Sequence, residues 1–174
     1  PYIPEPDSDP SYASPVAGIT SGRSYIRRKL MLDTSGGCLD RIQYFDGLGR
    51  PVQTVRKGVT PGGKDLVDFI DYDKRGRAWR QWNAVPVSGM SGAFISNMPE
   101  QAPGILGDTR PYSETLYEES PWGRPLLMTD AGIAWKEHPV QTVYTLNRAS
   151  GEYSCRQYKA GSDGTLQDAG MYPS

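Results

Sequence analysis

A six-residue pattern occurs at residues 45–50 and again at residues 72–77, and it restricts how the chain can fold. Both copies have an aromatic residue, Asp, two variable residues, Gly and Arg, and each lies between runs in which apolar and polar residues alternate. Glycine tolerates the positive φ of a tight hairpin, and aspartate can accept backbone N–H groups inside the turn. Period-two alternation is typical of strands. The pattern therefore predicts two similar β-hairpins, with chance agreement between ordinary turns as the alternative.

A third, altered copy lies at residues 117–124, where the aromatic is displaced and the Asp is lost. In each copy we expect the aromatic to pack on the sheet and the arginine to stack over an aromatic of a neighbouring hairpin. We predict a structural role for all the repeat residues, which are Phe45, Asp46, Gly49, Arg50, Tyr72, Asp73, Gly76, Arg77, Tyr117, Gly123 and Arg124.

The rest of the chain also predicts an all-β fold of consecutive antiparallel hairpins, arranged as a sheet or a sandwich. Of the 174 residues, 20 are Gly and 15 are Pro, which favours many turns between short elements. In the first expected strand, Ile26, Leu30 and Leu32 alternate with Arg27, Lys29 and Met31. In the second, Ile42 and Tyr44 share one face. Strands are expected at 24–32, 39–46, 50–57, 66–73, 77–83, 112–118, 124–129, 140–146 and 152–159.

The Pro-rich residues 1–23 predict an arm or linker, and residues 24–174 predict the hairpin domain. Within that domain, residues 84–111 interrupt the alternation and predict a long loop, with a short helix near 92–98. A loop of this length usually has a function or is disordered.

Charge and composition exclude several partners. The formal net charge is −1, which is too small to attract nucleic acid. No apolar run approaches the roughly 18 residues that span a bilayer. The chain begins with Pro1, so we expect a processed or excised segment. Cys38 and Cys155 lack metal-ligand spacing, and they are either two thiols or one disulfide. We expect no cofactor and no metal.

Four candidates for chemistry are not supported by the sequence. Residues 58–64 satisfy most of a phosphate-binding loop, but Asp65 stands where a hydroxyl is needed and a strand follows instead of a helix. Residues 71–82 open like a calcium loop, but Trp82 occupies the position of the bidentate Glu. His138 is the single histidine, and no nucleophile motif accompanies it. The carboxylates show no spacing that singles out a catalytic pair.

The tryptophans are the candidates for ligand contact. Trp79 and Trp82 are expected on opposite faces of one strand, so that one packs in the core. Trp122 lies in a turn and Trp135 in a loop. Each is more often a packing residue than a ligand platform, but several of them lining a groove would suit a glycan or peptide.

The chain resembles RHS/YD-repeat proteins. Residues 72–77 look like the Tyr-Asp-x-x-Gly-Arg hairpin of that family, and residues 44–53 look like it with Phe45 for Tyr. The stretches 44–53, 58–67 and 169–174 are similar to the domain that precedes the repeats in RHS-like proteins of Bacteroides relatives. The resemblance covers about residues 24–174. It implies secretion or cell-surface exposure and a hollow β shell that encloses another polypeptide, often a C-terminal toxin. The family's self-cleaving core lies further C-terminal, and no matching stretch occurs here.

These observations give two hypotheses. In the first, the chain is a non-catalytic structural domain that starts or caps a β shell, with the remaining RHS/YD-repeat region as its partner and a surface glycan or delivery protein as a further one. Such a piece should expose an apolar patch or an unpaired edge strand. In the second, it is an extracellular β-sandwich module that binds carbohydrate or peptide. An enzyme would need residues brought together from distant parts of the sequence.

Overall fold

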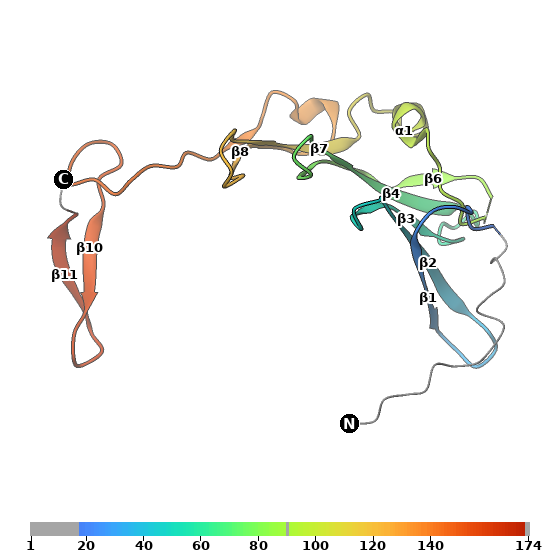
Figure 1. Ribbon diagram of the computed structural model, residues 1–174, viewed down its shortest axis with the longest axis horizontal. Coiled ribbons are helices and arrows are strands. Elements are labelled where there is room, and N and C mark those ends of the chain that lie inside the picture. The colour runs from blue at the N-terminus through green and yellow to red at the C-terminus, as the bar shows by residue number, and fades with distance from the viewer. Residues whose placement is uncertain (1–17, 90, 173–174) are drawn as a thin grey trace. The chain divides into compact units, whose positions relative to one another are not determined.

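The computed structural model describes residues 18–89 and 91–172, and its main element is one antiparallel sheet (Figure 1). The contacts divide the chain into two compact units, up to Val140 and from Gln141 onward. The all-β prediction is therefore confirmed, in the form of a sheet. The sequence pattern had grouped residues 24–174 as one domain.

The sheet follows the chain order, β1-β2-β3-β4-β5-β7-β8-β9, and β6 pairs with the first half of β4 while β5 pairs with its second half. Neighbours in sequence are thus neighbours in space, as consecutive hairpins require. The strands are β1 (Tyr25–Met31), β2 (Cys38–Phe45), β3 (Pro51–Arg56), β4 (Asp65–Tyr72), β5 (Ala78–Trp82), β6 (Val85–Val87), β7 (Tyr112–Tyr117), β8 (Pro125–Thr129) and β9 (Val140–Gln141). A 3₁₀ turn, η2 (Ile133–Trp135), lies between the last two.

The second unit contains one hairpin, formed by β10 (Arg156–Ala160) and β11 (Leu166–Met171). The strands expected at 140–146 and 152–159 are shorter than predicted. The first is reduced to the two residues of β9, and the second begins at Arg156.

The core lies on one face of the first unit's sheet. Ile42 and Tyr44 of β2 and Val67 and Phe69 of β4 alternate with half-buried or exposed residues, as a strand buried on one face requires. The buried apolar set is Ile42, Tyr44, Val55, Val67, Phe69, Val85, Met98 and Ala102.

Residues 84–111 are not a simple loop, because they contain β6 and the helix α1 (Met98–Leu106). The helix begins where the expected one was to end. Pro99 suits its first turn, and Gly107, at φ 67°, ends it. Met98 and Ala102 lie one turn apart and are fully buried, so this segment covers the core.

Buried polar side chains fasten this cover to the sheet. Asp65 accepts the backbone N–H groups of Gly58 and Gly92, both at 3.0 Å. The Tyr44 hydroxyl donates to the Gly92 carbonyl at 2.7 Å. The Gln53 amide donates to the carbonyl of Ile95 and accepts from its N–H. Each of these buried groups is therefore satisfied.

The predicted arm, residues 1–23, lies mostly outside the described residues. Of the part described, Ile19 packs against the core, and the Thr20 hydroxyl accepts the N–H of Phe94 at 2.9 Å. The guanidinium of Arg23 lies 3.6 Å from the centre of the Phe94 ring. These residues are therefore part of the first unit's packing.

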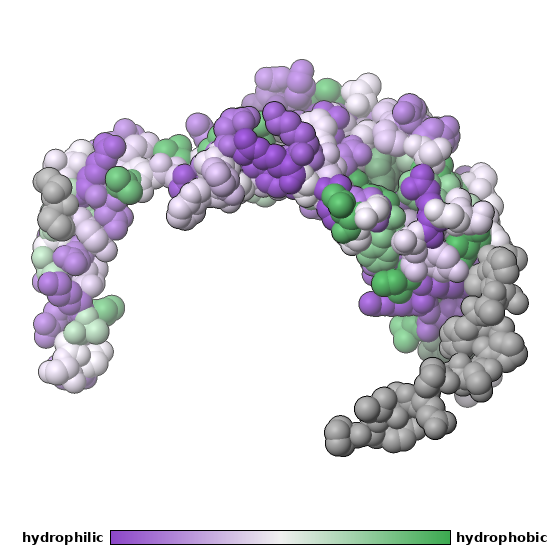
Figure 2. All heavy atoms as spheres, viewed as in Figure 1, coloured by the Kyte–Doolittle hydropathy of each residue, from purple (hydrophilic) through white to green (hydrophobic). Residues whose placement is uncertain are grey.

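One end of the sheet is formed by β1, whose outer side pairs with no other strand among the described residues. Its apolar residues Ile26 and Leu30 face away from the core and are 49% and 62% exposed. Hydrophobic and hydrophilic side chains consequently lie side by side on the surface of this end (Figure 2). Cys38 and Cys155 are free thiols in separate units, and none of the described helices could cross a bilayer.

Candidate functional site

The first repeat copy forms the turn between β2 and β3. The N–H of Asp46 donates to the carbonyl of Arg50 at 2.9 Å, and the N–H of Gly49 donates to the carbonyl of Asp46 at 3.0 Å. Gly49 has φ 76°, so the turn is a three-residue hairpin loop closed by a left-handed glycine. The Asp46 carboxylate accepts the N–H groups of Leu48 and Arg50, both at 2.9 Å, and binds the guanidinium of Arg50.

The second copy has the same geometry between β4 and β5. The Asp73 carboxylate accepts the N–H groups of Arg75 and Arg77 at 2.9 Å and the Nε of Arg77 at 2.8 Å. Gly76 has φ 82°. The roles expected for aspartate and glycine inside the turn are therefore present in both copies.

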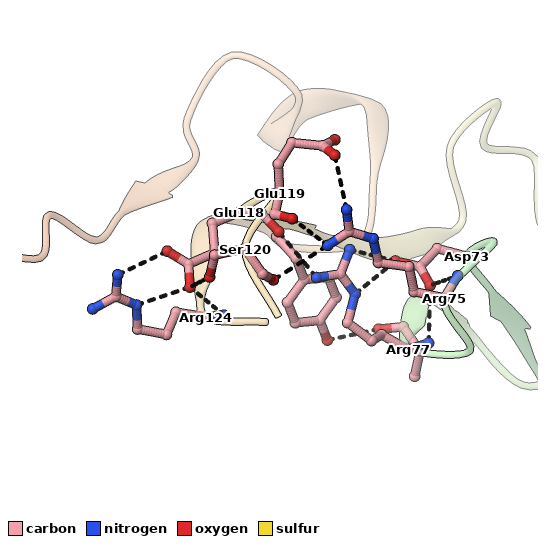
Figure 3. A network of polar contacts seen from close by, with 9 residues as sticks. Asp73, Arg75, Arg77, Glu118, Glu119, Ser120 and Arg124 are labelled. Carbon is pink, nitrogen blue, oxygen red and sulfur yellow. Dashed lines mark hydrogen bonds and ion pairs between the residues drawn. The ribbon is translucent and has the colours of Figure 1, made fainter. Parts of the chain in front are cut away.

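In the third copy, between β7 and β8, Glu118 takes the place of the aspartate. The acid that the repeat pattern indicated as lost is therefore present in a longer form. Tyr117 directly precedes this acid, so the aromatic keeps its place and two extra residues lengthen the turn instead. Glu118 accepts the Nε and Nη2 of Arg124 at 2.9 Å and the hydroxyl of Ser120 at 2.5 Å (Figure 3). Gly123 supplies the positive φ, 63°. The longer glutamate side chain spans the longer turn.

Each of the three hairpins also has a β-bulge at an equivalent place. The residue after the repeat arginine pairs with the repeat aromatic, as Ala78 does with Tyr72. The residue that follows has no partner in the register of the two strands. These residues are Val52, Trp79 and Leu126. These β-bulges make the three hairpins alike over a longer stretch than the sequence pattern covers.

The first hairpin contacts the second through Arg50. Its guanidinium carbon lies 4.4 Å from the centre of the Tyr72 ring, and the Tyr72 hydroxyl donates to the Pro51 carbonyl at 2.8 Å. A Cβ on Gly76 would lie 2.6 Å from Nη1 of Arg50. The glycine therefore closes its own turn and also leaves room for the arginine of the preceding hairpin.

The second hairpin contacts the third in the same way. The guanidinium of Arg77 lies 4.6 Å from the Tyr117 ring, and the Tyr117 hydroxyl donates to the Ala78 carbonyl at 2.8 Å. Arg77 also donates to the Glu118 carbonyl at 3.1 Å (Figure 3). A Cβ on Gly123 would lie 3.3 Å from Cδ of Arg77. We call the set Arg50, Tyr72, Arg77 and Tyr117 the arginine–aromatic ladder.

The second and third hairpins have one further link. Arg75, a variable residue of the second copy, binds the side chain and the carbonyl of Glu119 (Figure 3). Because Glu119 is 88% exposed, this pair contributes little.

The carboxylates of the three turns are held in their charged form. The N–H of Arg50 lowers the pKa of Asp46. Burial raises the pKa of Asp73, but the N–H and guanidinium of Arg77 outweigh it and the net shift is downward. The guanidinium of Arg124, followed by the Ser120 hydroxyl, lowers the pKa of Glu118 to about 2. These groups act as hydrogen-bond acceptors for turns and arginines.

The four tryptophans do not line a common groove. Trp82 stacks on Phe69 at 4.7 Å and donates its Nε1 to Asp71 at 2.8 Å, so it packs beside the core. The alternation that places Trp79 on the opposite face is interrupted, because Trp79 is the extra residue of a bulge. Its ring lies 3.9 Å from the guanidinium of Arg80, which also lies over Tyr112. Trp122 is 83% exposed at a turn, and Trp135 is half exposed.

A shallow hollow lies along the ladder. Its aromatic lining is Tyr72, Trp79 and Tyr117, its charged lining includes Lys74 and Glu119, and its volume is about 430 Å³. Trp79 is thus the one candidate tryptophan that lines this hollow. Aromatic floors with charged rims suit polar ligands that have a flat apolar face.

The residues of the rejected phosphate-loop, calcium-loop and histidine candidates lie in turns or make structural contacts. Residues 58–64 form the turn between β3 and β4, and Asp65 is buried as described above. Asp71 and Asp73 bind Trp82 and Arg77. His138 is exposed and meets Trp135 edge-on at 6.4 Å. Within the described part of the chain, no group of three His, Cys, Asp or Glu side chains is placed to hold a metal ion.

The fold and the ladder define a domain of β-hairpins that are joined laterally by arginine and aromatic side chains. The chain belongs to the family described as Domain of unknown function (DUF6443), which matches residues 21–148 and therefore includes all three repeat copies. No curated protein and no solved structure matches the chain.

Proposed function

We propose that this chain is a non-catalytic structural domain at the N-terminal side of an RHS/YD-repeat protein, where it starts or caps a β shell. The observation that carries the proposal is that three successive hairpins are joined by one repeated contact. The family resemblance of residues 72–77 supports the same reading, and it suggests a secreted or surface protein whose shell encloses a toxin or other cargo.

The repeated contact has a direction. In both contacts the earlier hairpin gives an arginine and a backbone carbonyl, and the following hairpin gives the aromatic ring, the hydroxyl and the glycine that makes room. Such a contact adds hairpins toward the C-terminus and requires, of the loop sequence, only the glycine. It therefore suits a domain on which further YD hairpins of the same polypeptide are built.

The carboxylates of the three repeat turns also favour a structural role. Each accepts at least one backbone N–H group and binds an arginine, and their pKa values are lowered. A general acid or base near neutral pH needs the opposite shift for a carboxyl group.

The test is size-exclusion chromatography with light scattering of this chain, alone and mixed with the segment that follows it in the parent polypeptide. A stable one-to-one complex is expected. Two species that elute separately at micromolar concentration would refute the docking role.

A second candidate, binding of carbohydrate or peptide, is favoured by the hollow lined by Tyr72, Trp79 and Tyr117. Under this hypothesis Trp79→Ala reduces retention on a glycan column, whereas Trp122→Ala, which removes an exposed ring elsewhere, does not. Equal retention of both variants and the parent chain would count against a glycan site.

A further inference from the structure

Three arginines stand side by side on the open face of the sheet, away from the core. In the strand register Arg28 of β1 is directly opposite Arg41 of β2, and Arg41 is directly opposite Arg56 of β3. Residues directly opposite on adjacent strands point to the same face, with neighbouring strands about 4.8 Å apart. Like charges in this position repel each other, so placing the three arginines side by side does not stabilise the sheet.

The arginine row is poorly neutralised within the described residues. Arg56 binds Asp68 at 2.5 Å, yet its Nε is buried without a hydrogen-bond partner. Arg28 and Arg41 are exposed, and neither makes an ion pair within the described part of the chain. Arg27, on the opposite face, is by contrast paired with Asp40 at 2.5 Å.

Exposed apolar residues flank the arginine row on both sides. Ile26 precedes Arg28 on the open face, and Leu30 follows it, opposite Leu39 of β2. Leu30 is 62% exposed and Leu39 is 46% exposed. Along β1 the open face is therefore apolar, cationic and apolar, with a spacing of about 6.8 Å for every second strand residue.

We infer that the arginine row binds an acidic polypeptide segment in extended conformation, in which a carboxylate side chain has apolar side chains two residues before and after it. Such a segment has the same spacing as the open face of β1, and guanidinium groups bind carboxylates in a bidentate manner. The apolar neighbours would cover Ile26, Leu30 and Leu39. This inference concerns a different surface from the ladder and does not depend on the proposed function.

The surroundings disfavour two other anionic partners. A polysaccharide would use aromatic platforms, but Tyr25 and Tyr44 lie on the opposite face of β1 and β2. A lipid surface would contact the tip of the β1–β2 hairpin, where the Asp33 carboxylate accepts the N–H groups of Ser35 and Gly37. The Ser35 hydroxyl and the Gly37 N–H lower the pKa of Asp33, so the tip carries a charge that resists burial in a membrane.

The experiment measures binding of the whole chain to a fluorescent synthetic peptide in which leucine, glutamate and leucine occupy alternate positions, with threonine between them. The variant is Arg28→Gln with Arg41→Gln, and the matched control is Lys29→Gln, which removes an exposed cation from the other face of β1. We expect the double variant to weaken binding at least about fivefold and the control to leave it unchanged. Because the two arginines repel each other, the double variant should unfold at the same temperature as the parent chain or higher.

The competing outcomes are distinct. The inference is refuted if a peptide with glutamine in place of glutamate binds equally well, if Lys29→Gln weakens binding as much as the double variant, or if no binding is seen. Stronger, arginine-dependent binding to a sulfated polysaccharide or to phosphatidylserine vesicles would also overturn it in favour of that partner. Each outcome is independent of whether the following segment of the polypeptide docks on the ladder.

Discussion

The contact between Arg77 and Tyr117 gives the sharpest test of the ladder. Arg77 is 25% exposed, and its guanidinium faces the Tyr117 ring at 4.6 Å. A cation–π contact is worth roughly 0.5–1 kcal/mol at an exposed site and about 2 kcal/mol when desolvated. At this intermediate burial we expect a coupling energy of about 1 kcal/mol.

A double-mutant cycle isolates that energy. Arg77→Met also removes the ion pair with Asp73, but this loss is common to both sides of the cycle and cancels. Tyr117→Leu removes the ring, whereas Tyr117→Phe keeps it and removes the hydroxyl bond to Ala78, worth about 1 kcal/mol. We therefore expect coupling of about 1 kcal/mol between Arg77→Met and Tyr117→Leu, and near zero between Arg77→Met and Tyr117→Phe.

The assay is urea unfolding of the four proteins in each cycle, followed by circular dichroism at neutral pH. Each 1 kcal/mol should also lower the unfolding temperature by about 2–4 °C. If the leucine cycle gives coupling within about 0.5 kcal/mol of zero, the two changes are additive and the arginine does not join the hairpins through the ring.

Three further predictions follow from the same contacts. Gly49→Ala should destabilise by about 1 kcal/mol, because an L residue is forced to positive φ, and Gly76→Ala by about 2 kcal/mol, because its Cβ also displaces Arg50; equal losses in urea melts would argue against the close approach of Arg50. The pKa of Glu118 is about 2 in the fold against an ordinary 4.5, so its contribution to stability is present above pH 4.5 and is lost as the pH falls toward 2. Glu118→Gln should therefore reduce the dependence of the unfolding midpoint on pH between pH 4.5 and 2. An unchanged dependence would contradict the assignment. Asp65→Ala leaves two backbone N–H groups without their acceptor and should lower the unfolding free energy by roughly 2–4 kcal/mol, with faster hydrogen exchange at Gly92, whereas exchange at the parent rate would show that the carboxylate does not protect this N–H.

The hairpins could be predicted because their signals are local. Alternation and a turn glycine lie within a few residues of each other, and they located β2 to β5, β7 and β8. The contacts of Arg50 with Tyr72 and of Arg77 with Tyr117 were also predictable, because two equal repeats separated by strand length must lie side by side. Glu118 could not be predicted from the repeat pattern, because the pattern has an aspartate at fixed spacing, whereas the longer third turn accommodates a longer acid.

Other features depend on contacts between distant residues. The bulges at Val52, Trp79 and Leu126 are differences in register, and register is set by the partner strand as well as by the sequence of the strand itself. α1 contains Pro103 in its interior, which is unfavourable for a helix, and it persists because Met98 and Ala102 are buried on the core. In β1 the alternation is real, but the apolar face points away from the core.

The turn geometry and the repeat residues can be separated, and this separation shows what the repeat residues are for. In the β10–β11 hairpin, Gly161 donates to the Thr165 carbonyl at 2.7 Å, Gly164 donates to the Gly161 carbonyl at 3.0 Å, and Gly164 has φ 79°. This is the backbone geometry of the repeat turns, formed without an aromatic, an aspartate or an arginine in the repeat positions. Next to this turn, Ala160 pairs with Leu166 and Lys159 pairs with Gln167, so the bulge of the repeat hairpins is absent at this place. Asp163, at a variable position of this turn, accepts the Thr165 N–H at 3.1 Å and the Thr165 hydroxyl at 2.7 Å. A glycine, the backbone bonds and an acid at another position therefore close such a turn without the repeat residues. The aromatic and the arginine are needed for the contact between hairpins, and the bulge accompanies them in all three copies. We conclude that the repeat encodes lateral joining of hairpins more than the shape of a single hairpin.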